Sequence, residues 1–560
     1  MTTNKKSVAM LADILIKKGL EYLVHSPGSR NAPIIIAFSH RKEVKIITCV
    51  DERSAAFYAL GLALETGKTV AIDCTSGTAS LNYAPAIAEA FYQHIPLLVL
   101  TADRSPEHIN IGDGQTINQE KLYTNYIKAS FSLPQSINEQ DDFLKVTTMA
   151  HQAMDMTTTE NPGPVHINIP LSEPLYGQTD ESPVYKEIIF PEYQPKPVKQ
   201  LPPALGEQLR QSVKVMVIAG QMIPNKEINL ELGRLTEKKG VVVLTETTSN
   251  LYHPEFIDGI DNVISTFGTD ETPLFKPQLL ITLGGAVVSK MIKKYLRNNQ
   301  PQFHWHISPS GENMDTYFCL TETIKGSPQE VLQLINDLQQ SQSTEYKSLW
   351  LKKKTLINQR RQIFLAQTQY SDLQVFNTIL NHLPRGINLH LGNSTPVRYS
   401  QLFGSLPSIN YYSNRGVSGI DGQISTAAGI ASASPEKLNV LITGDLGFLY
   451  DSNGLLLLQH CPNLKIIVIN NQGGGIFRFI PGPDTVEGFE QYFEAQHPLQ
   501  FEYLTKAFGL DYLKATNPQE LKEQLPKLFQ HVNQSVILEI YTPQEENGVV
   551  LRNYFKALKS

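Results

Sequence analysis

The feature that most constrains this chain is a series of short, continuously apolar runs that alternate with longer segments of helical periodicity. Strands that are apolar on both faces are typical of parallel sheets covered by helices on both sides. The sequence therefore predicts an α/β protein built from doubly wound parallel sheets. The predicted strands, rich in Val, Ile and Leu, occupy 44–50, 69–74, 96–101, 165–169, 213–219, 241–245, 278–284, 387–392, 438–444, 464–469 and 536–540.

Three domains are expected, because the chain has 560 residues and a domain holds roughly 100–200. The segment 180–206 is rich in proline and charge, which is typical of a linker. The polar segment 340–372 is predicted to be a helical connector. The predicted domains are therefore 1–180, 200–340 and 370–560.

Charge and hydropathy argue against two classes of partner. The net charge is −6 and there is no long basic run, so nucleic-acid binding is not expected. No apolar run reaches the roughly 18 residues that a membrane-spanning helix needs, so no such helix is expected. The N-terminal segment 5–20 has helical spacing, with Asp13 inside its apolar part. We interpret it as a surface helix rather than a targeting segment.

The four cysteines, Cys49, Cys74, Cys319 and Cys461, are scattered along the chain and show no CxxC spacing. This pattern favours reduced, buried thiols over a zinc site or a disulfide framework. Reduced thiols are the rule in the cytosol, so a cytoplasmic protein is expected.

Unusual polar clusters follow many of the predicted strands, at the point where each strand ends. In open parallel sheets, ligands bind beyond the carboxyl ends of the strands. Any one cluster is consistent with an ordinary turn, but the set also contains arginines, which turns do not need. The clusters therefore predict a ligand site built from the first and last domains. They are "SPGSR" (26–30), "DERSAAF" (51–57), "TSGTA" (75–79), "ADR" (102–104), "GNSTPVR" (392–398), "SNRG" (413–416), "GDLG" (444–447) and "NNQGGG" (470–475).

Asp445 and Asn471 end two predicted strands that are consecutive in the sequence. Such strands usually lie side by side in a parallel sheet, so both side chains are expected at the same crevice. Carboxylate, amide and backbone carbonyl oxygens suit Mg²⁺, which completes its octahedron with phosphate and water. The glycines at 473–475 let the backbone approach a phosphate and offer N–H groups. We interpret the pair as a metal–diphosphate site; a solvated turn whose aspartate caps a helix is the alternative.

This order of motifs, GD and then NN at the end of the next strand, resembles the diphosphate motif of thiamine-diphosphate enzymes. The resemblance implies thiamine diphosphate held through Mg²⁺, with Mn²⁺ as an alternative. It also implies three doubly wound domains of that enzyme type: a pyrimidine-binding domain (1–180), a central α/β domain (200–340) and a pyrophosphate-binding domain (370–560).

The pyrimidine-binding domain of that family supplies a glutamate, and Glu52 matches it, at a strand end and in the first turn of a predicted helix. By resemblance, its carboxylate would bond the aminopyrimidine ring nitrogen and so promote loss of the proton from the thiazolium carbon. A carboxylate that only stabilises the helix N-terminus is the alternative.

Further motifs resemble, in order and across nearly the full chain, the 2-succinyl-5-enolpyruvyl-6-hydroxy-3-cyclohexene-1-carboxylate synthases of menaquinone biosynthesis. The resemblance implies a transferase that decarboxylates 2-oxoglutarate and adds the resulting succinyl-semialdehyde carbanion to isochorismate. Both substrates are dicarboxylates, which guanidinium groups can pair with bidentately. For each arginine taken singly, a surface salt bridge is the alternative. The motifs are "SPGSR", "DERSAAF", "CTSGTA", "TADR", "GNSTPVR", "NRGVSGIDG" and "GDLGFLYD".

The resemblance also implies roles for individual residues. The catalytic residues would be Glu52, Gln115, Ser394, Arg398 and Arg415, the last two holding the 2-oxoglutarate carboxylates. The contacts to isochorismate would come from Ser29, Arg30, Arg104, Lys290, Ile476 and Phe477. The cofactor would be bound by Glu52, Thr78, Ile420, Gly444, Leu446 and Gly447, and the metal by Asp445, Asn471 and the Gly473 carbonyl. Core packing is the alternative for the apolar residues Ile420, Ile476 and Phe477.

In the same superfamily, the glutamate-bearing domain of one subunit faces the diphosphate-bearing domain of another. A homodimer or homotetramer with active sites at the subunit interface is therefore implied. Another thiamine-diphosphate 2-keto-acid decarboxylase, or an acetolactate-synthase-like carboligase, stays open as an alternative, although no adjacent histidines occur here. A non-catalytic α/β nucleotide-binding or scaffold protein is the alternative from another class, and Glu52 argues against it.

Overall fold

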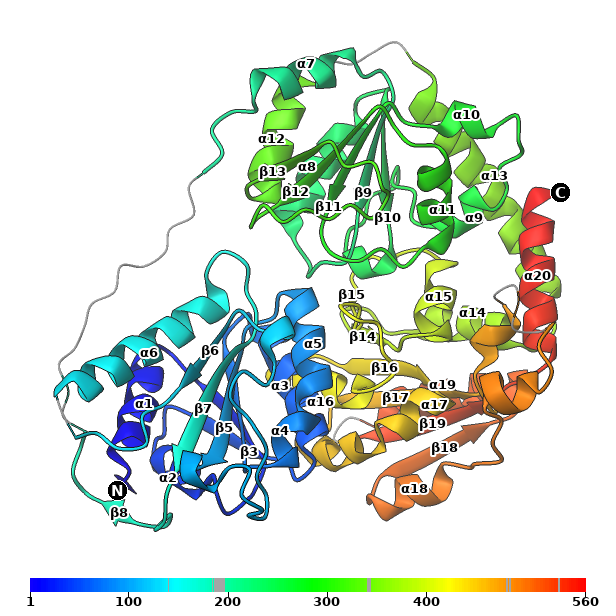
Figure 1. Cartoon of the computed structure of the whole chain (residues 1–560). Coiled ribbons are helices and arrows are strands. Elements are labelled where there is room, and N and C mark those ends of the chain that lie inside the picture. The colour runs from blue at the N-terminus through cyan, green and yellow to red at the C-terminus, as the bar shows by residue number, and fades with distance from the viewer. Residues whose placement is uncertain are drawn as a thin grey trace. The chain divides into compact units, whose positions relative to one another are not determined.

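The computed structural model describes all residues of the chain except 139, 184, 186–196, 340–343, 480, 481, 483, 484, 532 and 533. It contains three parallel sheets whose faces are covered by helices (Figure 1). The prediction of an α/β protein with doubly wound parallel sheets is confirmed. Each apolar run that was predicted to be a strand corresponds to a strand of the structure.

By its internal contacts the chain divides into two compact units. Unit 1 comprises Met1–Gln194, Asn414–Glu436 and Leu449–Leu464. Unit 2 comprises Pro195–Ser413, Lys437–Phe448 and Lys465–Ser560.

The main sheet of unit 1 has the strand order β3-β2-β4-β5-β7-β6, and every neighbouring pair is parallel. Helices α1, α2 and α6 bury their apolar residues against one face of it, and α3 and α5 cover the other (Figure 1). The strands are β2 (Tyr22–His25), β3 (Lys45–Thr48), β4 (Val70–Cys74), β5 (Leu97–Arg104), β6 (Ala129–Ser132) and β7 (Val165–Leu171), with a small antiparallel pair of β1 (Thr2–Thr3) and β8 (Gln178–Thr179). The helices are α1 (Lys6–Lys17), α2 (Ala32–Ser39), α3 (Glu52–Thr66), α4 (Thr78–Asn82), α5 (Ala84–Gln93), α6 (Gln140–Thr158) and α16 (Gln423–Ala433), and the 3₁₀ segment η4 spans Ser452–His460.

Helix α3 carries the glutamate that the sequence singled out. It begins at Glu52 because the side chain of Asp51 caps it, accepting a hydrogen bond from the Ser54 N–H at 3.1 Å. It packs closely on α16, since a Cβ at Gly61 would lie 2.1 Å from the carbonyl oxygen of Thr426. The close contact of these two helices fixes the direction in which the first turn of α3 points.

Unit 2 holds two sheets, ordered β10-β9-β11-β12-β13 and β15-β14-β16-β17-β19-β18. One continuous hydrophobic cluster, with members from both sheets and their helices, joins them. The strands are β9 (Val215–Ala219), β10 (Val241–Thr245), β11 (Leu279–Leu283), β12 (Phe303–Ser308), β13 (Glu322–Lys325), β14 (Asn388–Leu391), β15 (Asn410–Tyr412), β16 (Asn439–Gly444), β17 (Leu464–Asn470), β18 (Asp511–Ala515) and β19 (Val536–Tyr541). The helices are α7 (Pro203–Gln211), α8 (Lys226–Thr236), α9 (Ile260–Ile264), α10 (Thr272–Phe275), α11 (Lys290–Asn298), α12 (Pro328–Leu338), α13 (Tyr346–Gln367), α14 (Asp372–His382), α15 (Thr395–Gln401), α17 (Asp445–Tyr450), α18 (Glu502–Ala507), α19 (Pro518–Gln530) and α20 (Glu546–Lys559).

Eight strands of the structure lie outside the predicted runs: β1, β2, β6, β8, β12, β13, β15 and β18. Four of them have a clear physical reason. Strands β6, β13 and β18 lie at sheet edges, where one side of the strand is unpaired and an apolar run is not required. Strand β12 lies inside its sheet, but its sequence "FHWHIS" contains two histidines, which are buried. Buried histidines need polar partners, which a sequence pattern does not reveal.

Two segments between the predicted domains differ in how far the structure describes them. The predicted connector 340–372 contains the helix α13, and 340–343 lie outside the described residues. Much of the predicted linker 180–206 also lies outside them. The N-terminal segment forms α1, as expected. Over the described residues, none of the helices has both the length and the apolarity that crossing a membrane requires.

Candidate active site

Glu52 lies at the start of α3 and is half-buried. Burial is the main cause that raises the pKa of its carboxyl group, and the charge of the adjacent Asp51 adds to it. Among the residues that the structure describes, no side chain forms a hydrogen bond with this carboxylate. A half-buried carboxyl group with a raised pKa and, among the described residues, no side-chain partner is typical of a functional position.

Two loops of unit 1 that the sequence singled out, 26–30 and 75–79, contact each other. Thr75 Oγ1 accepts a hydrogen bond from the Arg30 N–H at 3.2 Å. Ser76 Oγ donates to the carbonyl of Gln115 at 2.9 Å, and Gln115 has a left-handed backbone with φ 55°. Thr78 begins α4 directly after this contact. The structure therefore brings Arg30, Gln115 and Thr78 onto adjoining loops.

Arg30 and Arg104 place two guanidinium groups near each other. Arg30 is buried, donates to the Leu171 carbonyl at 3.2 Å and contacts the exposed carboxylate of Glu173 at 3.2 Å. Arg104 donates to the Gly114 carbonyl at 3.2 Å and, within the described part of the chain, forms no ion pair. Burial, followed by the charge of Arg104, lowers the pKa of Arg30, while Glu173 acts in the opposite direction. Glu173 pairs with Arg30 alone, so the charge of Arg104 stays uncompensated among the described residues and favours a bound anion.

The loop that carries Arg415 is anchored by Glu89, a residue that the sequence analysis missed. Glu89 is buried in α5, and its carboxylate accepts the N–H groups of Gly416 and Val417, each at 2.7 Å. Burial raises the pKa of Glu89, and these hydrogen bonds oppose the shift. Ile420 lies on the same loop. The only signal in the sequence was a single carboxylate within an otherwise apolar helix, "APAIAEAFYQ".

In unit 2, Asp445 lies against the glycine-rich loop that follows β17. β16 and β17 are neighbouring strands, so their carboxyl ends lie together. Asp445 is buried; its Oδ2 accepts the N–H of Gly473 at 2.9 Å and lies 3.3 Å from His497 Nε2. Asn471 is buried in the same loop. His497 is a further residue that the sequence did not reveal.

Asp372, which the sequence analysis also missed, connects to the same cluster. Its Oδ2 accepts a hydrogen bond from Asn471 Nδ2 at 3.3 Å, and its Oδ1 accepts one from Thr542 Oγ1 at 2.6 Å. Burial is the main cause that raises the pKa of Asp372, to about 6, and the charge of Asp445 adds to the shift. Because the amide nitrogen of Asn471 is committed to Asp372, the amide oxygen is the atom that can face a cation.

The glycines of this loop are required by the fold itself. Gly473 has φ 156°, and a Cβ there would lie 2.8 Å from the carbonyl oxygen of Glu494. The next residue, Gly474, donates its N–H to the same carbonyl at 2.6 Å. A side chain at 473 would therefore displace the loop from Asp445, whether or not a phosphate is bound.

Ser394 and Arg398 lie together at the start of α15. Ser394 has an unusual backbone conformation, with φ 73° and ψ −121°, and its carbonyl accepts a hydrogen bond from Arg398 Nη1. Burial lowers the pKa of Arg398, and the charge of Asp261 opposes this. The buried Asp261 carboxylate also accepts a hydrogen bond from Ser289, which caps the helix that begins at Lys290. Asp261 thus links the elements that carry Arg398 and Lys290.

The remaining predicted residues are divided between the two units. Ser29 lies on the exposed part of the loop 26–30, and Ile420 is half-buried. Ile476 and Phe477 occupy a 3₁₀ turn (Gly475–Arg478), and both are half-buried. Gly444, Leu446 and Gly447 flank Asp445. None of the three apolar residues Ile420, Ile476 and Phe477 is fully buried.

Three family models match the chain in order. The model described as "Thiamine pyrophosphate enzyme, N-terminal TPP binding domain" matches residues 5–122. "Middle domain of thiamine pyrophosphate" matches residues 194–391, and "Thiamine pyrophosphate enzyme, C-terminal TPP binding domain" matches residues 392–540.

Curated relatives are similar over almost their whole length. The chain is 42% identical to a 2-succinyl-5-enolpyruvyl-6-hydroxy-3-cyclohexene-1-carboxylate synthase of Flavobacterium psychrophilum, over 98% of both chains. It is 38% identical to the enzyme of the same name from Porphyromonas gingivalis, over 99% of this chain and 97% of the relative. The Bacteroides thetaiotaomicron enzyme of that name is 37% identical over the full length of both chains.

Three parallel sheets in this order, with an acidic residue and an amide at the ends of β16 and β17, define a protein of the thiamine pyrophosphate enzyme class. The relatives narrow this class. The chain belongs to the family of 2-succinyl-5-enolpyruvyl-6-hydroxy-3-cyclohexene-1-carboxylate synthases.

Proposed function

We propose that this chain decarboxylates 2-oxoglutarate with thiamine diphosphate and joins the remaining four-carbon unit to isochorismate. The products are CO₂ and 2-succinyl-5-enolpyruvyl-6-hydroxy-3-cyclohexene-1-carboxylate, an intermediate of menaquinone biosynthesis. The reaction follows from the name that the relatives carry, and the chain's own residues supply independent support for it.

The observation that carries this proposal is the pair of neighbouring guanidinium groups of Arg30 and Arg104. Arg30 is buried and, in the described part of the chain, Arg104 has no carboxylate partner, so the pair can offer positive charge to a bound anion. Guanidinium groups bind carboxylates bidentately, and isochorismate carries two carboxylates. Lys290, at the start of α11 in unit 2, is a further cation for the same substrate. For the other substrate, 2-oxoglutarate, we propose that Arg398 and Arg415 bind the carboxylates.

The residues present fit a diphosphate held through Mg²⁺. Asp445 offers a carboxylate, Asn471 offers an amide oxygen whose nitrogen is already engaged, and Gly473 offers a carbonyl. Mg²⁺ prefers such hard oxygen donors and keeps positions for phosphate and water. Gly444, Leu446 and Gly447 would contact the diphosphate from the Asp445 side, and Thr78 from the other unit. Mn²⁺ would be accepted by the same donors.

Thiamine diphosphate, when bound, would supply a carbon nucleophile for the 2-oxo group and a cationic ring that accepts the electron pair released by decarboxylation. The role of Glu52 would be to hold a proton that faces the aminopyrimidine ring nitrogen of the cofactor. Its raised pKa lets it keep that proton at a higher pH than an exposed glutamate would. Gln115 and Ser394 would orient the reacting groups, Ile420 would support the cofactor, and Ile476 and Phe477 would exclude water beside the isochorismate ring.

We further propose a cytoplasmic homodimer or homotetramer in which Glu52 of one subunit and Asp445 of another complete each site. This proposal rests on the resemblance to thiamine-diphosphate enzymes, in which the glutamate-bearing domain of one subunit faces the diphosphate-bearing domain of another. No observation favours a second function.

One assay tests the reaction. Purified protein is supplied with thiamine diphosphate, Mg²⁺, 2-oxoglutarate and isochorismate, and CO₂ release and the carbon–carbon coupled product are both measured. We expect both products in equal amounts. Equal turnover with pyruvate in place of 2-oxoglutarate would contradict the dicarboxylate assignment and favour a different thiamine-diphosphate enzyme.

A further inference from the structure

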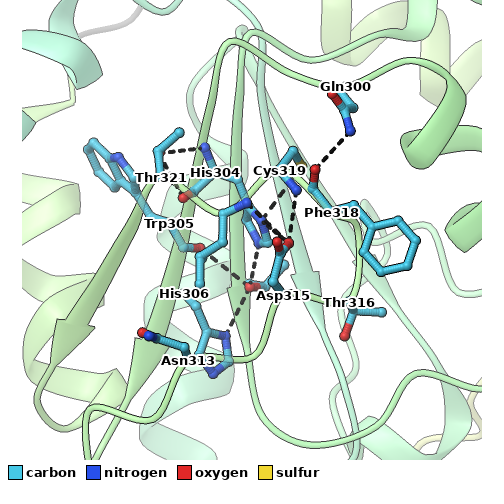
Figure 2. A network of polar contacts seen from close by, with 12 residues as sticks. Gln300, His304, Trp305, His306, Asn313, Asp315, Thr316, Phe318, Cys319 and Thr321 are labelled. Atoms are coloured by element: carbon cyan, nitrogen blue, oxygen red, sulfur yellow. Dashed lines mark hydrogen bonds and ion pairs between the residues drawn. The ribbon is translucent and has the colours of Figure 1, made fainter.

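Three side chains with metal-binding atoms lie together at the amino-terminal end of β12 (Figure 2). His304 is the second residue of that strand and is buried, and Asp315 and Cys319 come from the loop that leads to β13. His304 Nδ1 lies 3.7 Å from Cys319 Sγ and 3.9 Å from Asp315 Oδ1. A tetrahedral zinc ion separates nitrogen, sulfur and oxygen ligands by about 3.3–3.6 Å. The separations of His304 Nδ1 from Cys319 Sγ and from Asp315 Oδ1 are therefore close to those between the ligand atoms of a bound zinc ion.

The ring of His304 is held in place by its other nitrogen. Nε2 lies 3.0 Å from Thr282 Oγ1, which also contacts the Trp305 carbonyl at 3.3 Å and His306 Nδ1 at 3.0 Å. When the threonine donates to the carbonyl, it accepts from both rings, so His304 carries its proton on Nε2. Nδ1 then presents a lone pair to the other two members of the cluster. Metal-ligating histidines are oriented by an outer partner in this way.

The loop is fixed so that the thiol faces the histidine. Asp315 Oδ1 accepts the backbone N–H groups of Cys319 at 2.9 Å and of Leu320 at 3.1 Å. Phe318 has φ 60°, a left-handed conformation that bulky residues rarely adopt. Its carbonyl accepts a hydrogen bond from Gln300 at 2.8 Å, and its ring points away from the cluster (Figure 2). An unfavourable backbone conformation beside converging ligand atoms is typical of a functional site.

The arrangement differs from that of a cysteine nucleophile with its base. In a catalytic triad, the histidine contacts the nucleophile through one nitrogen and the orienting carboxylate through the other. Here Cys319 and Asp315 approach the same nitrogen of His304, and a threonine occupies the second nitrogen. One imidazole nitrogen, one sulfur and one carboxylate oxygen around a common point form the donor set of zinc rather than of Mg²⁺.

We propose that His304, Asp315 and Cys319 bind one divalent transition-metal ion, zinc foremost, with water in the fourth position. The ion would tie the loop before β13 to strand β12 and so stabilise the central sheet. His304 lies at the amino end of its strand, whereas Lys290 follows the carboxyl end of the neighbouring β11. The site is therefore separate from the proposed active site.

Cobalt absorption tests this proposal without any measurement of activity. The full-length protein, saturated with thiamine diphosphate and Mg²⁺, is titrated with Co²⁺ under reducing conditions. We expect one equivalent of Co²⁺ to produce a near-ultraviolet sulfur-to-cobalt band with tetrahedral visible bands, and Zn²⁺ to displace it. Zn²⁺ is also expected to raise the melting temperature. The absence of a saturable sulfur-to-cobalt band would overturn the proposal.

Matched variants assign the band to the cluster. Cys319→Ala is expected to abolish it, and Asp315→Asn to weaken binding while retaining the oxygen that accepts the backbone N–H groups. Thr282→Val, which removes only the outer partner of the histidine, is expected to weaken binding by about 10–100-fold. Cys461→Ala is the control, because Cys461 is buried and donates to the Ala428 carbonyl at 3.0 Å, in unit 1. A band that survives in Cys319→Ala would show that the metal binds elsewhere and overturn the assignment.

Discussion

The Asp372 carboxylate accepts a hydrogen bond from the side-chain amide of Asn471 at 3.3 Å, although 99 positions separate the two residues in the chain. The contact determines which end of the amide is available for other partners. It therefore gives Asp372 a positioning role toward the proposed metal ligand Asn471, and this role can be tested.

Replacing Asp372 by alanine is expected to weaken Mg²⁺-dependent binding of thiamine diphosphate by about 10–100-fold, because the Asn471 amide is no longer held in one orientation. At saturating cofactor, kcat should change much less. Isothermal titration with thiamine diphosphate at several Mg²⁺ concentrations measures the effect. Thr542→Val, which removes the hydrogen bond that Thr542 donates to Asp372, is the matched control and should have a smaller effect. An unchanged cofactor affinity in Asp372→Ala would rule out the positioning role.

Substituting Glu52 by glutamine should leave cofactor binding nearly intact and reduce kcat by about 100-fold or more, because an amide of the same shape cannot take up or release a proton. Thiamine diphosphate affinity and turnover are measured on the same preparation. Asp51→Asn is a control that changes the adjacent charge and the cap of α3 but not the proposed catalytic group. Turnover retained in Glu52→Gln would remove the assigned role of Glu52.

Replacing Arg398 by alanine should raise the KM for 2-oxoglutarate by at least about 10-fold, since the loss of one charge-assisted pair costs roughly 1.5–3 kcal/mol. The affinity for thiamine diphosphate should be unchanged. Arg398→Lys tests whether the fork-shaped guanidinium group is needed, because lysine keeps the charge but not the bidentate geometry. If both variants retained the wild-type KM, Arg398 would have to be assigned to the fold, where it hydrogen-bonds the Ser394 carbonyl.

The stability of unit 1 should depend on pH through Asp451. Its carboxylate accepts hydrogen bonds from the N–H and hydroxyl of Ser425 at 2.8 and 3.0 Å, yet burial raises its pKa from 3.8 to about 7. The folded state therefore binds more protons than the unfolded state between these values, so stability falls as pH rises from about 4 to 7, by at most about 1.4 kcal/mol per pH unit. Asp451→Asn should flatten this part of the profile. Urea unfolding at several pH values checks it, and an identical slope in the variant would contradict the prediction.

Mixing two inactive variants tests whether sites are shared between subunits. Glu52→Gln and Asp445→Asn are each expected to be inactive alone. If dimers re-form at random and each site takes one residue from each subunit, about a quarter of the wild-type activity should return, because half of the dimers hold one intact site. Light scattering establishes the oligomeric state of the same samples. No recovery after verified subunit exchange would place both residues in a site within one chain.

The sequence by itself determined the fold class, most of the strands and the class of the ligand site. These are local properties: apolar runs record burial on both faces of a strand, and the residue after a strand end is fixed by chain order. The strands that precede Asp445 and Asn471 could be placed side by side in advance, because they are consecutive in the chain. The family motifs then indicated which individual residues are candidates for the site.

Only the tertiary structure revealed the residues that hold these motifs in place. Glu89 binds the backbone of the Arg415 loop, Asp372 orients Asn471, and Asp261 connects the elements of Lys290 and Arg398. The same holds for His304, Asp315 and Cys319, whose spacing matches no short motif. The contacts of Glu89, Asp372 and Asp261 join segments that are far apart in the chain, whereas His304, Asp315 and Cys319 are brought together by the path of one loop. Neither arrangement leaves a periodic pattern in the sequence.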